Sequence, residues 1–172
     1  MYTALDINNY LVSRIGEQGT KTKRQKLLYF AQAWHLAWYG APLFVDEIRA
    51  WENGPVVESV WRNHRTENSE SIDQPTINHM QAILDYYGDM TGSRLSDLTH
   101  EQDPWVQAYQ NGTGKNSIIS QDSMFGFYSL QAEGPIRPET TELKEISDDE
   151  FLTALEEINE RLAGVDAILM DR

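Results

Sequence analysis

Apolar residues are so dense in the stretch QKLLYFAQAWHLAWYG, residues 25–40, that they face almost every direction around a helix. A helix that is apolar all round needs packing partners on several sides. We therefore predict that this stretch is the buried, central helix of the fold. We expect Thr22 to cap its N-terminus, and Gly40, followed by Pro42, to end it.

Three polar residues interrupt this apolar helix at regular intervals. Gln25, Tyr29 and Gln32 recur at i, i+4 and i+7, so they lie on one side of the helix. Their side chains can all form hydrogen bonds. We predict that this polar stripe reaches water or a partner.

Helical periodicity recurs on both sides of the central helix. Thr3 and Asp6 have the spacing of a capping box, which predicts a first helix that ends near Gly16 and packs on the central one. Further amphipathic patterns, caps and Gly or Pro stops predict five more helices or helical turns. They cover residues 55–64, 77–87, 93–98 and 103–109, and a helix that Ser120 or Asp122 caps and that runs to Leu130.

Apolar and polar residues alternate between the central helix and the next one. The alternation predicts a short strand or extended segment over Val45–Glu52. Asn53 and Gly54 would then turn the chain, with Pro55 at the first position of the following helix. The fold class we predict is mainly α: a single compact multi-helix domain around a buried central helix, with a short strand or hairpin element near residues 44–52.

The C-terminal part has a different pattern. Residues 131–146 contain Gly and Pro and show no period, which predicts a linker after a domain of residues 1–130. Ser147 and Glu150 then form a capping box that opens an acidic amphipathic helix over 147–172. The apolar face of this helix either docks on the protein's own core or meets a partner, and the sequence leaves both open.

The composition narrows the classes of function. The chain has 172 residues, a net charge of −13 and no cysteine, which rules out disulfides and thiolate chemistry. An acidic chain repels the phosphate backbone, so a nucleic-acid partner is not expected. The sequence shows neither a signal-peptide pattern nor a membrane-length apolar run, and we expect a cytoplasmic protein.

Lysine and arginine cluster at one place, where Lys21, Lys23, Arg24 and Lys26 fall within six residues. A phosphate-binding role is conceivable there. We favour a solvated helix start, because cations at a helix N-terminus oppose the helix dipole.

Residues with catalytic or metal-binding chemistry form no recognisable motif. The four histidines, His35, His64, His79 and His100, lack metal-ligand spacing, and nucleophile-elbow, P-loop and dinucleotide-binding glycine patterns are missing. We therefore expect no metal, no cofactor and no enzymatic activity. The large aromatic residues Trp34, Trp51 and Trp105 are expected to build the core.

Four motifs in a fixed order resemble a known family. They are KLLYFAQAWHLAWYG at residues 26–40, PLF at 42–44, IRAWENGPVV at 48–57 and DPW at 103–105. In this order they resemble the SocA-like Panacea antitoxin domain, over roughly Leu5 to Leu130, and two departures, at Arg24 and Glu58, weaken the match only slightly. The motif residues expected to have structural roles are Lys26, Leu27, Leu28, Tyr29, Phe30, Trp51, Gly54, Pro55, Val56 and Trp105.

The resemblance implies a predominantly helical, non-catalytic antitoxin. Such a protein would belong to a two-gene, type II toxin–antitoxin system, often on a prophage or another mobile element, and would neutralise its toxin by direct contact. The alternative implied by one branch is a proteolytic adaptor that hands a partner to the ClpXP protease. The toxin and the oligomeric state are unknown from the sequence.

Three surfaces are candidates for binding the toxin. The first is the polar stripe of the central helix, and the second is the exposed edge of the predicted strand. The third is the acidic face of the final helix. Their residues are Gln25, Tyr29 and Gln32 for the stripe, Glu47 and Arg49 for the strand, and Glu156, Glu157 and Glu160 for the helix.

Overall fold

The structure is a computed structural model that describes residues 2–16, 19–63, 71–134 and 137–139. The final helix predicted over 147–172, with Glu156, Glu157 and Glu160, lies outside the described residues, as do His64 and most of the predicted linker. In the described ranges the order of elements is α1 (Ala4–Ile15), α2 (Lys21–Tyr39), β1 (Arg49–Trp51), β2 (Gly54–Val56), α3 (Glu58–Arg62), α4 (Gln74–Tyr87), α5 (Gly92–His100), α6 (Asp103–Tyr109), the 3-10 turn η2 (Gln110–Gly112) and α7 (Gln121–Ala132). The mainly α fold class is confirmed.

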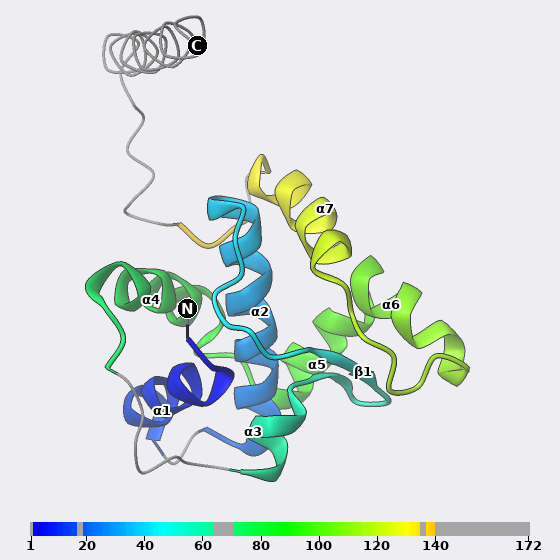
Figure 1. Ribbon diagram of the computed structural model, residues 1–172, viewed down its shortest axis with the longest axis horizontal. Coiled ribbons are helices and arrows are strands. Elements are labelled where there is room, and N and C mark those ends of the chain that lie inside the picture. The colour runs from blue at the N-terminus through cyan, green and yellow to red at the C-terminus, as the bar shows by residue number, and fades with distance from the viewer. Residues whose placement is uncertain (1, 17–18, 64–70, 135–136, 140–172) are drawn as a thin grey trace, which may run out of the picture. The chain divides into compact units, whose positions relative to one another are not determined.

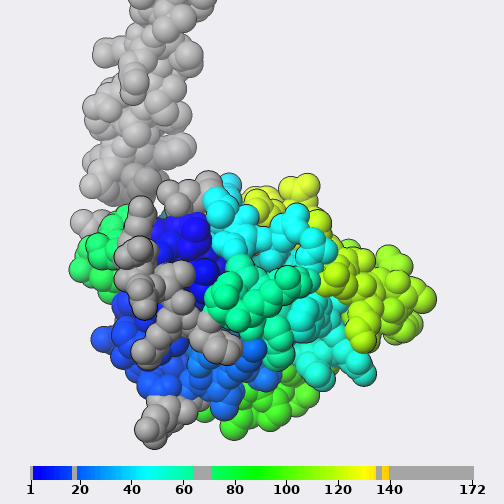
Figure 2. Space-filling model, turned by 60° about the horizontal axis from the view of Figure 1, so that its bottom comes forward, coloured from blue at the N-terminus to red at the C-terminus, as the bar shows by residue number. Residues whose placement is uncertain are grey.

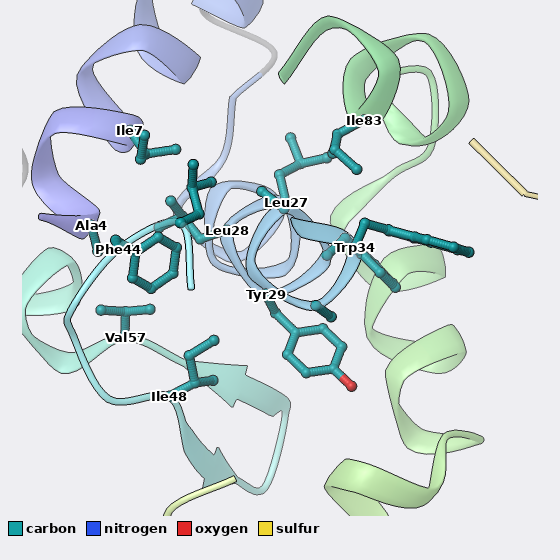
Figure 3. Packing of buried hydrophobic residues seen from close by; sticks show 14 of the residues in the cluster. Ala4, Ile7, Leu27, Leu28, Tyr29, Trp34, Phe44, Ile48, Val57 and Ile83 are labelled. Atoms are coloured by element: carbon teal, nitrogen blue, oxygen red, sulfur yellow. The ribbon is translucent and has the colours of Figure 1, made fainter. Parts of the chain in front are cut away.

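Helix α2 is the buried centre of this part of the chain, as the sequence predicted. It stands between α1 and α4 on one side and α6 and α7 on the other (Figure 1). Figure 3 shows Ile7, Ile83, Phe44 and Val57 pointing at it from several directions. The dense apolar pattern requires this arrangement, because every face of the helix needs a cover.

The two ends of α2 follow capping rules, with one correction. The N-cap is Thr20, whose side chain accepts a hydrogen bond from the Lys23 amide, and not Thr22. Both threonines satisfy the sequence rule, but only Thr20 stands three residues before a free first-turn amide. The C-terminal end is at Gly40, in the left-handed conformation with φ 65°, as predicted.

Helices α1 and α7 begin where local signals placed them, whereas α4 begins at Gln74, three residues before the predicted range 77–87. Thr3 and Asp6 form the predicted capping box of α1. Asp73 caps α4, and Ser120, one of the two predicted candidates, caps α7. The short turn predicted over 93–98 is a nine-residue helix, α5.

The strand region differs from the prediction. Strand β1 is only three residues long and pairs antiparallel with β2, in the register Arg49 to Val56, Ala50 to Pro55 and Trp51 to Gly54. Pro55 therefore lies in a strand and does not start α3, which begins at Glu58. The reason is tertiary, because side chains of α2 bind the backbone of residues 55 and 57 and keep it extended.

The edge of β1 that the sequence left exposed is covered. The Ala50 amide donates to the Ser117 carbonyl at 2.8 Å, and the Asn116 amide donates to the Ala50 carbonyl at 2.7 Å. The Ile119 amide likewise donates to the Ile48 carbonyl at 2.8 Å. The prediction of an open strand edge for a partner is therefore wrong.

Candidate functional site

The polar stripe of α2 is not a surface. Gln25 and Gln32 are each 1% exposed and Tyr29 is fully buried, so the prediction that the stripe reaches water or a partner is wrong. A polar stripe on a central helix can also serve to bind buried backbone, because unpaired amides and carbonyls are costly in a core.

Gln32 binds the chain that follows α2. Its Oε1 accepts hydrogen bonds from the Leu43 amide at 2.9 Å and the Phe44 amide at 3.1 Å. Its Nε2 donates to the Phe44 carbonyl at 3.0 Å. One side chain thus pairs three buried backbone groups of the P-L-F motif.

Gln25, about two turns earlier on α2, binds a later part of the chain in the same way. Its Oε1 accepts from the Val57 amide at 2.7 Å, and its Nε2 donates to the Val57 carbonyl at 3.3 Å. These two glutamines fix the path of residues 43–57 against α2. Tyr29 lies between them in the core, where its ring packs edge-on against Phe30 and Tyr128.

The two residues predicted at the strand edge, Glu47 and Arg49, form ion pairs and hydrogen bonds within the protein. The Arg49 guanidinium pairs with the Glu47 carboxylate at 2.7 Å and lies 3.9 Å from the Glu58 carboxylate. It also donates to the Asn116 carbonyl at 3.0 Å. Glu47 and Arg49 remain on the surface, but their charges already have partners.

The basic cluster at the start of α2 is largely inside the protein, which contradicts the predicted solvated helix start. The Lys23 Nζ donates to the Gly88 carbonyl at 2.5 Å, and Arg24 donates to the Gly19 carbonyl. Lys21 lies over the Trp61 ring, 4.1 Å from its centroid. Lys26 is the most enclosed, with 1% exposure.

Lys26 is the unusual member of the cluster. Its Nζ donates to the Pro55 carbonyl at 3.0 Å. The ion pairs formed among the described residues do not include it. Burial without a counter-ion disfavours the charged ammonium, and this desolvation lowers the pKa of Lys26 to about 7.

A cleft of about 820 Å³ opens at Lys26. It lies where the start of α2, the β1–β2 hairpin, α3 and α5 meet, and Figure 2 shows these segments together on one face of the molecule. Its lining residues are Thr20, Thr22, Gln25, Lys26, Trp51, Glu52, Asn53, Val56, Trp61, Thr91, Gly92, Ser93, Ser96, Asp97, His100 and Lys115.

Aromatic rings form one side of this Lys26 cleft. Trp51 and Trp61 meet edge to face, with ring centroids 5.4 Å apart. The Trp51 Nε1 donates to the Asn116 Oδ1 at 2.9 Å, which fixes the ring. Both rings are partly exposed, so they offer apolar area to a ligand while remaining anchored.

His100 lines the cleft from α5. Its ring contacts the Trp105 ring in a tilted arrangement, with centroids 4.2 Å apart, and Trp105 in turn donates to the Trp51 carbonyl at 3.0 Å. Desolvation lowers the pKa of His100, and the nearby Lys26 charge lowers it further. The imidazole is therefore held in its neutral form next to the ammonium.

The surroundings of Gly54 explain why the A-W-x-x-G-P-V motif has a glycine at this position. Its φ is +93°, and an added Cβ would lie 2.7 Å from the Thr99 Oγ1 and 2.8 Å from the Lys26 Nζ. A side chain at this position would be strained and would also collide with the buried ammonium. The glycine thus leaves room for Lys26.

The motifs of the sequence therefore converge on one place. Lys26, Trp51 and Val56 line the cleft, Gly54 and Pro55 contact Lys26, and Trp105 supports its wall. Sequence reasoning gave these residues structural roles but missed the cleft. The signal available was the lysine inside an otherwise apolar motif.

The histidines of the described part of the chain do not form a metal site. His35 contacts the Ala41 carbonyl at 2.6 Å, and the His79 Nε2 lies 2.9 Å from the Ala31 carbonyl. Among the residues described, no group of three or more His, Cys, Asp or Glu side chains could hold a metal ion. None of the described helices is long and apolar enough to cross a membrane.

The fold and the cleft define a mainly α domain built on one buried helix, with a lysine-centred site at the start of that helix. Residues 25–106 match the family model described as "Antitoxin SocA-like, Panacea domain". The match agrees with the resemblance that the motifs carried, and it shows that this part of the chain is similar to SocA-like Panacea domains. No curated protein and no solved structure matches the chain.

The matched range is narrower than the resemblance seen in the sequence, which ran from about Leu5 to Leu130. It begins at Gln25 and ends at Val106, so it contains most of the cleft lining. Helices α1 and α7, which pack on α2, lie outside it.

Proposed function

We propose that this protein is the antitoxin of a two-gene, type II toxin–antitoxin system, acts in the cytoplasm, and neutralises a toxin protein by binding it directly. The observation that carries the proposal is the match of residues 25–106 to an antitoxin family. The side chains that the family motifs contribute hold the domain together and enclose one cleft, which supports a scaffold that presents a binding site.

The mechanism proposed is occlusion of the toxin. Occlusion needs complementary surfaces and no catalytic group or cofactor. A net charge of −13 would steer the protein towards a basic toxin and speed their association. The same charge disfavours a role in binding nucleic acid.

The structure changes which surface we assign to the toxin. The α2 stripe and the backbone edge of β1 are engaged within the protein. The final helix lies outside the described residues and stays a candidate. The Lys26 cleft, which the sequence did not suggest, is concave, has aromatic and polar lining, and is the site in the described residues that we favour.

Co-expression with the product of the neighbouring gene tests the proposal. We expect that product alone to arrest growth, and growth to return, with a stable purified complex, when this chain is present. A neighbour that is not toxic, and that does not bind this chain, would overturn the proposal. Rescue that disappears in a host lacking ClpXP would instead assign the adaptor role.

A further inference from the structure

Lys26 is a buried cation whose hydrogen-bonding capacity is only partly used by the described residues. An ammonium carries three N–H donors, and the hydrogen bond to the Pro55 carbonyl uses one of them. Buried charges in proteins are normally paired. Among the described residues the salt bridges leave Lys26 without a carboxylate, so this part of the chain does not supply the counter-ion that its burial calls for.

The groups around Lys26 make the inner end of the cleft positive. The first turns of α2 and α5 both line it, so the N-terminal ends of two helices add their partial positive charge. Lys21 lies near its aromatic side, over Trp61, and adds a second cation.

The acidic groups of the cleft lie at its rim. Glu52 and Asp97 are both exposed, and the Glu52 carboxylate is 3.6 Å from the ammonium of Lys115, which is also exposed. Solvent screens these rim charges, whereas the enclosed Lys26 is screened little. A single anion could therefore be attracted inside a protein that is acidic overall.

We propose that the Lys26 cleft binds a carboxylate carried by a short peptide segment of the partner protein. Lys26 acts as the counter-cation, and the rings of Trp51 and Trp61 contact the apolar part of the segment. That the partner is the toxin rests on the function proposed above. An acidic patch is a poor ligand, because the net charge of −13 repels it, while one carboxylate on an otherwise neutral or basic segment is not repelled.

The size of the cleft agrees with this kind of ligand. A volume of about 820 Å³ lies within the range of about 300–1,000 Å³ typical of sites for drug-sized ligands. It is thus suited to a chain end or a few residues. The peptide segment of the partner would bury its carboxylate at Lys26. The rest of the partner would contact the rim of the cleft.

The first experiment uses N-acetyl-phenylalanine as the probe on the full chain. We expect it to raise the pKa of Lys26, followed by NMR at the lysine Cε, by about one pH unit at saturation, since an anion favours the charged ammonium. N-acetyl-phenylalanine amide, which has the ring but lacks the carboxylate, should leave that pKa unchanged. Equal effects of the two compounds, or no effect of either, would overturn the proposal.

The second experiment uses the complex with the toxin. Lys26→Met keeps the aliphatic stem and removes the charge, and we expect it to weaken toxin binding about tenfold or more. The control, Arg14→Met, removes one exposed cation from α1 that does not line the cleft, and should change binding less than about twofold. Circular dichroism and urea unfolding would show that both variants fold.

The two experiments test the carboxylate site and the antitoxin function separately. A stable toxin complex whose affinity is the same with Lys26→Met would overturn the cleft as the docking site and leave the antitoxin proposal standing. A failed toxin complex combined with a carboxylate-dependent shift at Lys26 would overturn the antitoxin function and support the carboxylate site.

Discussion

The buried titratable groups at the two ends of helix α2 differ in whether they can change their charge near neutral pH. Against its C-terminal half, His79 is enclosed beside the Ala31 carbonyl, and desolvation with the nearby His35 lowers the pKa of His79 to about 3. Near its start, Lys26 is enclosed at a cleft, and its pKa is about 7. One group is neutral throughout the physiological range, and the other can still change its charge there.

This difference separates polar groups with a structural role from the one that we propose to bind a ligand. At the C-terminal half, the Trp34 Nε1 donates to the Tyr87 hydroxyl at 3.0 Å, and Tyr87 stacks on Phe30 with centroids 4.1 Å apart. Such groups stabilise the core through partners within the protein. Lys26, in contrast, lines a cleft, and among the described residues its Nζ donates to the Pro55 carbonyl alone. A buried polar group that lines a cleft is therefore a more informative signal of a binding site than a buried polar group paired inside the core.

The largest expected effect on stability concerns a buried polar residue with a structural role, Gln32. Gln32→Leu would leave the amides of Leu43 and Phe44 and the Phe44 carbonyl unpaired in the core. We expect the free energy of unfolding to fall by about 4 kcal/mol. Urea unfolding measures it, with Gln131→Leu on the exposed side of α7 as the control; a loss below about 1 kcal/mol would mean that water replaces the glutamine.

Gly54→Ala probes the cleft end of α2. We expect a loss of about 3 kcal/mol, because φ is +93° and the new Cβ would collide with Thr99 and Lys26. The control is Gly126→Ala in α7, where a Cβ has nothing within 4 Å and should be neutral or slightly stabilising. If the two variants melt alike, the close approach to Lys26 is not real.

The pH dependence of stability should show Lys26 directly. Its pKa is lowered from 10.5 to about 7 by folding, so the unfolded chain binds more protons between these values and stability rises with pH. From pH 7 to 9 we expect the wild type to gain about 2.5 kcal/mol relative to Lys26→Met. Parallel stability curves for the two proteins would contradict the burial of a charged lysine.

His79 should likewise make the free energy of unfolding rise with pH, but in a lower pH range. Its folded pKa of about 3 lies below the ordinary 6.5, so its contribution is complete above pH 6.5 and is lost as the pH falls towards 3. Between pH 6.5 and 5 the wild type should lose about 2 kcal/mol more than His79→Gln. Guanidinium unfolding at each pH tests this, and an equal loss in both proteins would argue for a solvated imidazole.

The smallest effect concerns the aromatic pair at the C-terminal half of α2. Tyr87→Phe keeps the stack on Phe30 but removes the acceptor of the Trp34 N–H, and should cost about 1 kcal/mol. Tyr86→Phe, on the adjacent and partly buried tyrosine, is the control and should stay within about 0.5 kcal/mol. Thermal unfolding of the two variants side by side would distinguish them.

Local signals in the sequence predicted what local physics determines. The capping box of Thr3 and Asp6, the stop at Gly40 and the cap at Ser120 depend on residues within one turn, and all three were found. The buried central helix was predicted as well, because its apolar residues face all directions. These features required no knowledge of distant segments.

The errors concern side chains whose partners are far along the chain. A polar stripe such as Gln25 and Gln32 has the same pattern whether it faces water or binds buried backbone, and the partners here lie 11 to 32 residues away. Lys26 was missed for the same reason, since its enclosure depends on Gly54 and α5. The cleft exists only once those segments meet.

The glutamine bonds of α2 also bear on the order in which the protein folds. Gln32 joins residues only 11 and 12 positions later, and Gln25 joins one 32 positions later, whereas the Trp34 ring meets Tyr128, which lies 94 positions later (128 − 34). Closing a short loop costs less entropy than closing a long one. We therefore expect residues 43–57 to settle on α2 early, and α7 to complete the core late in the folding reaction.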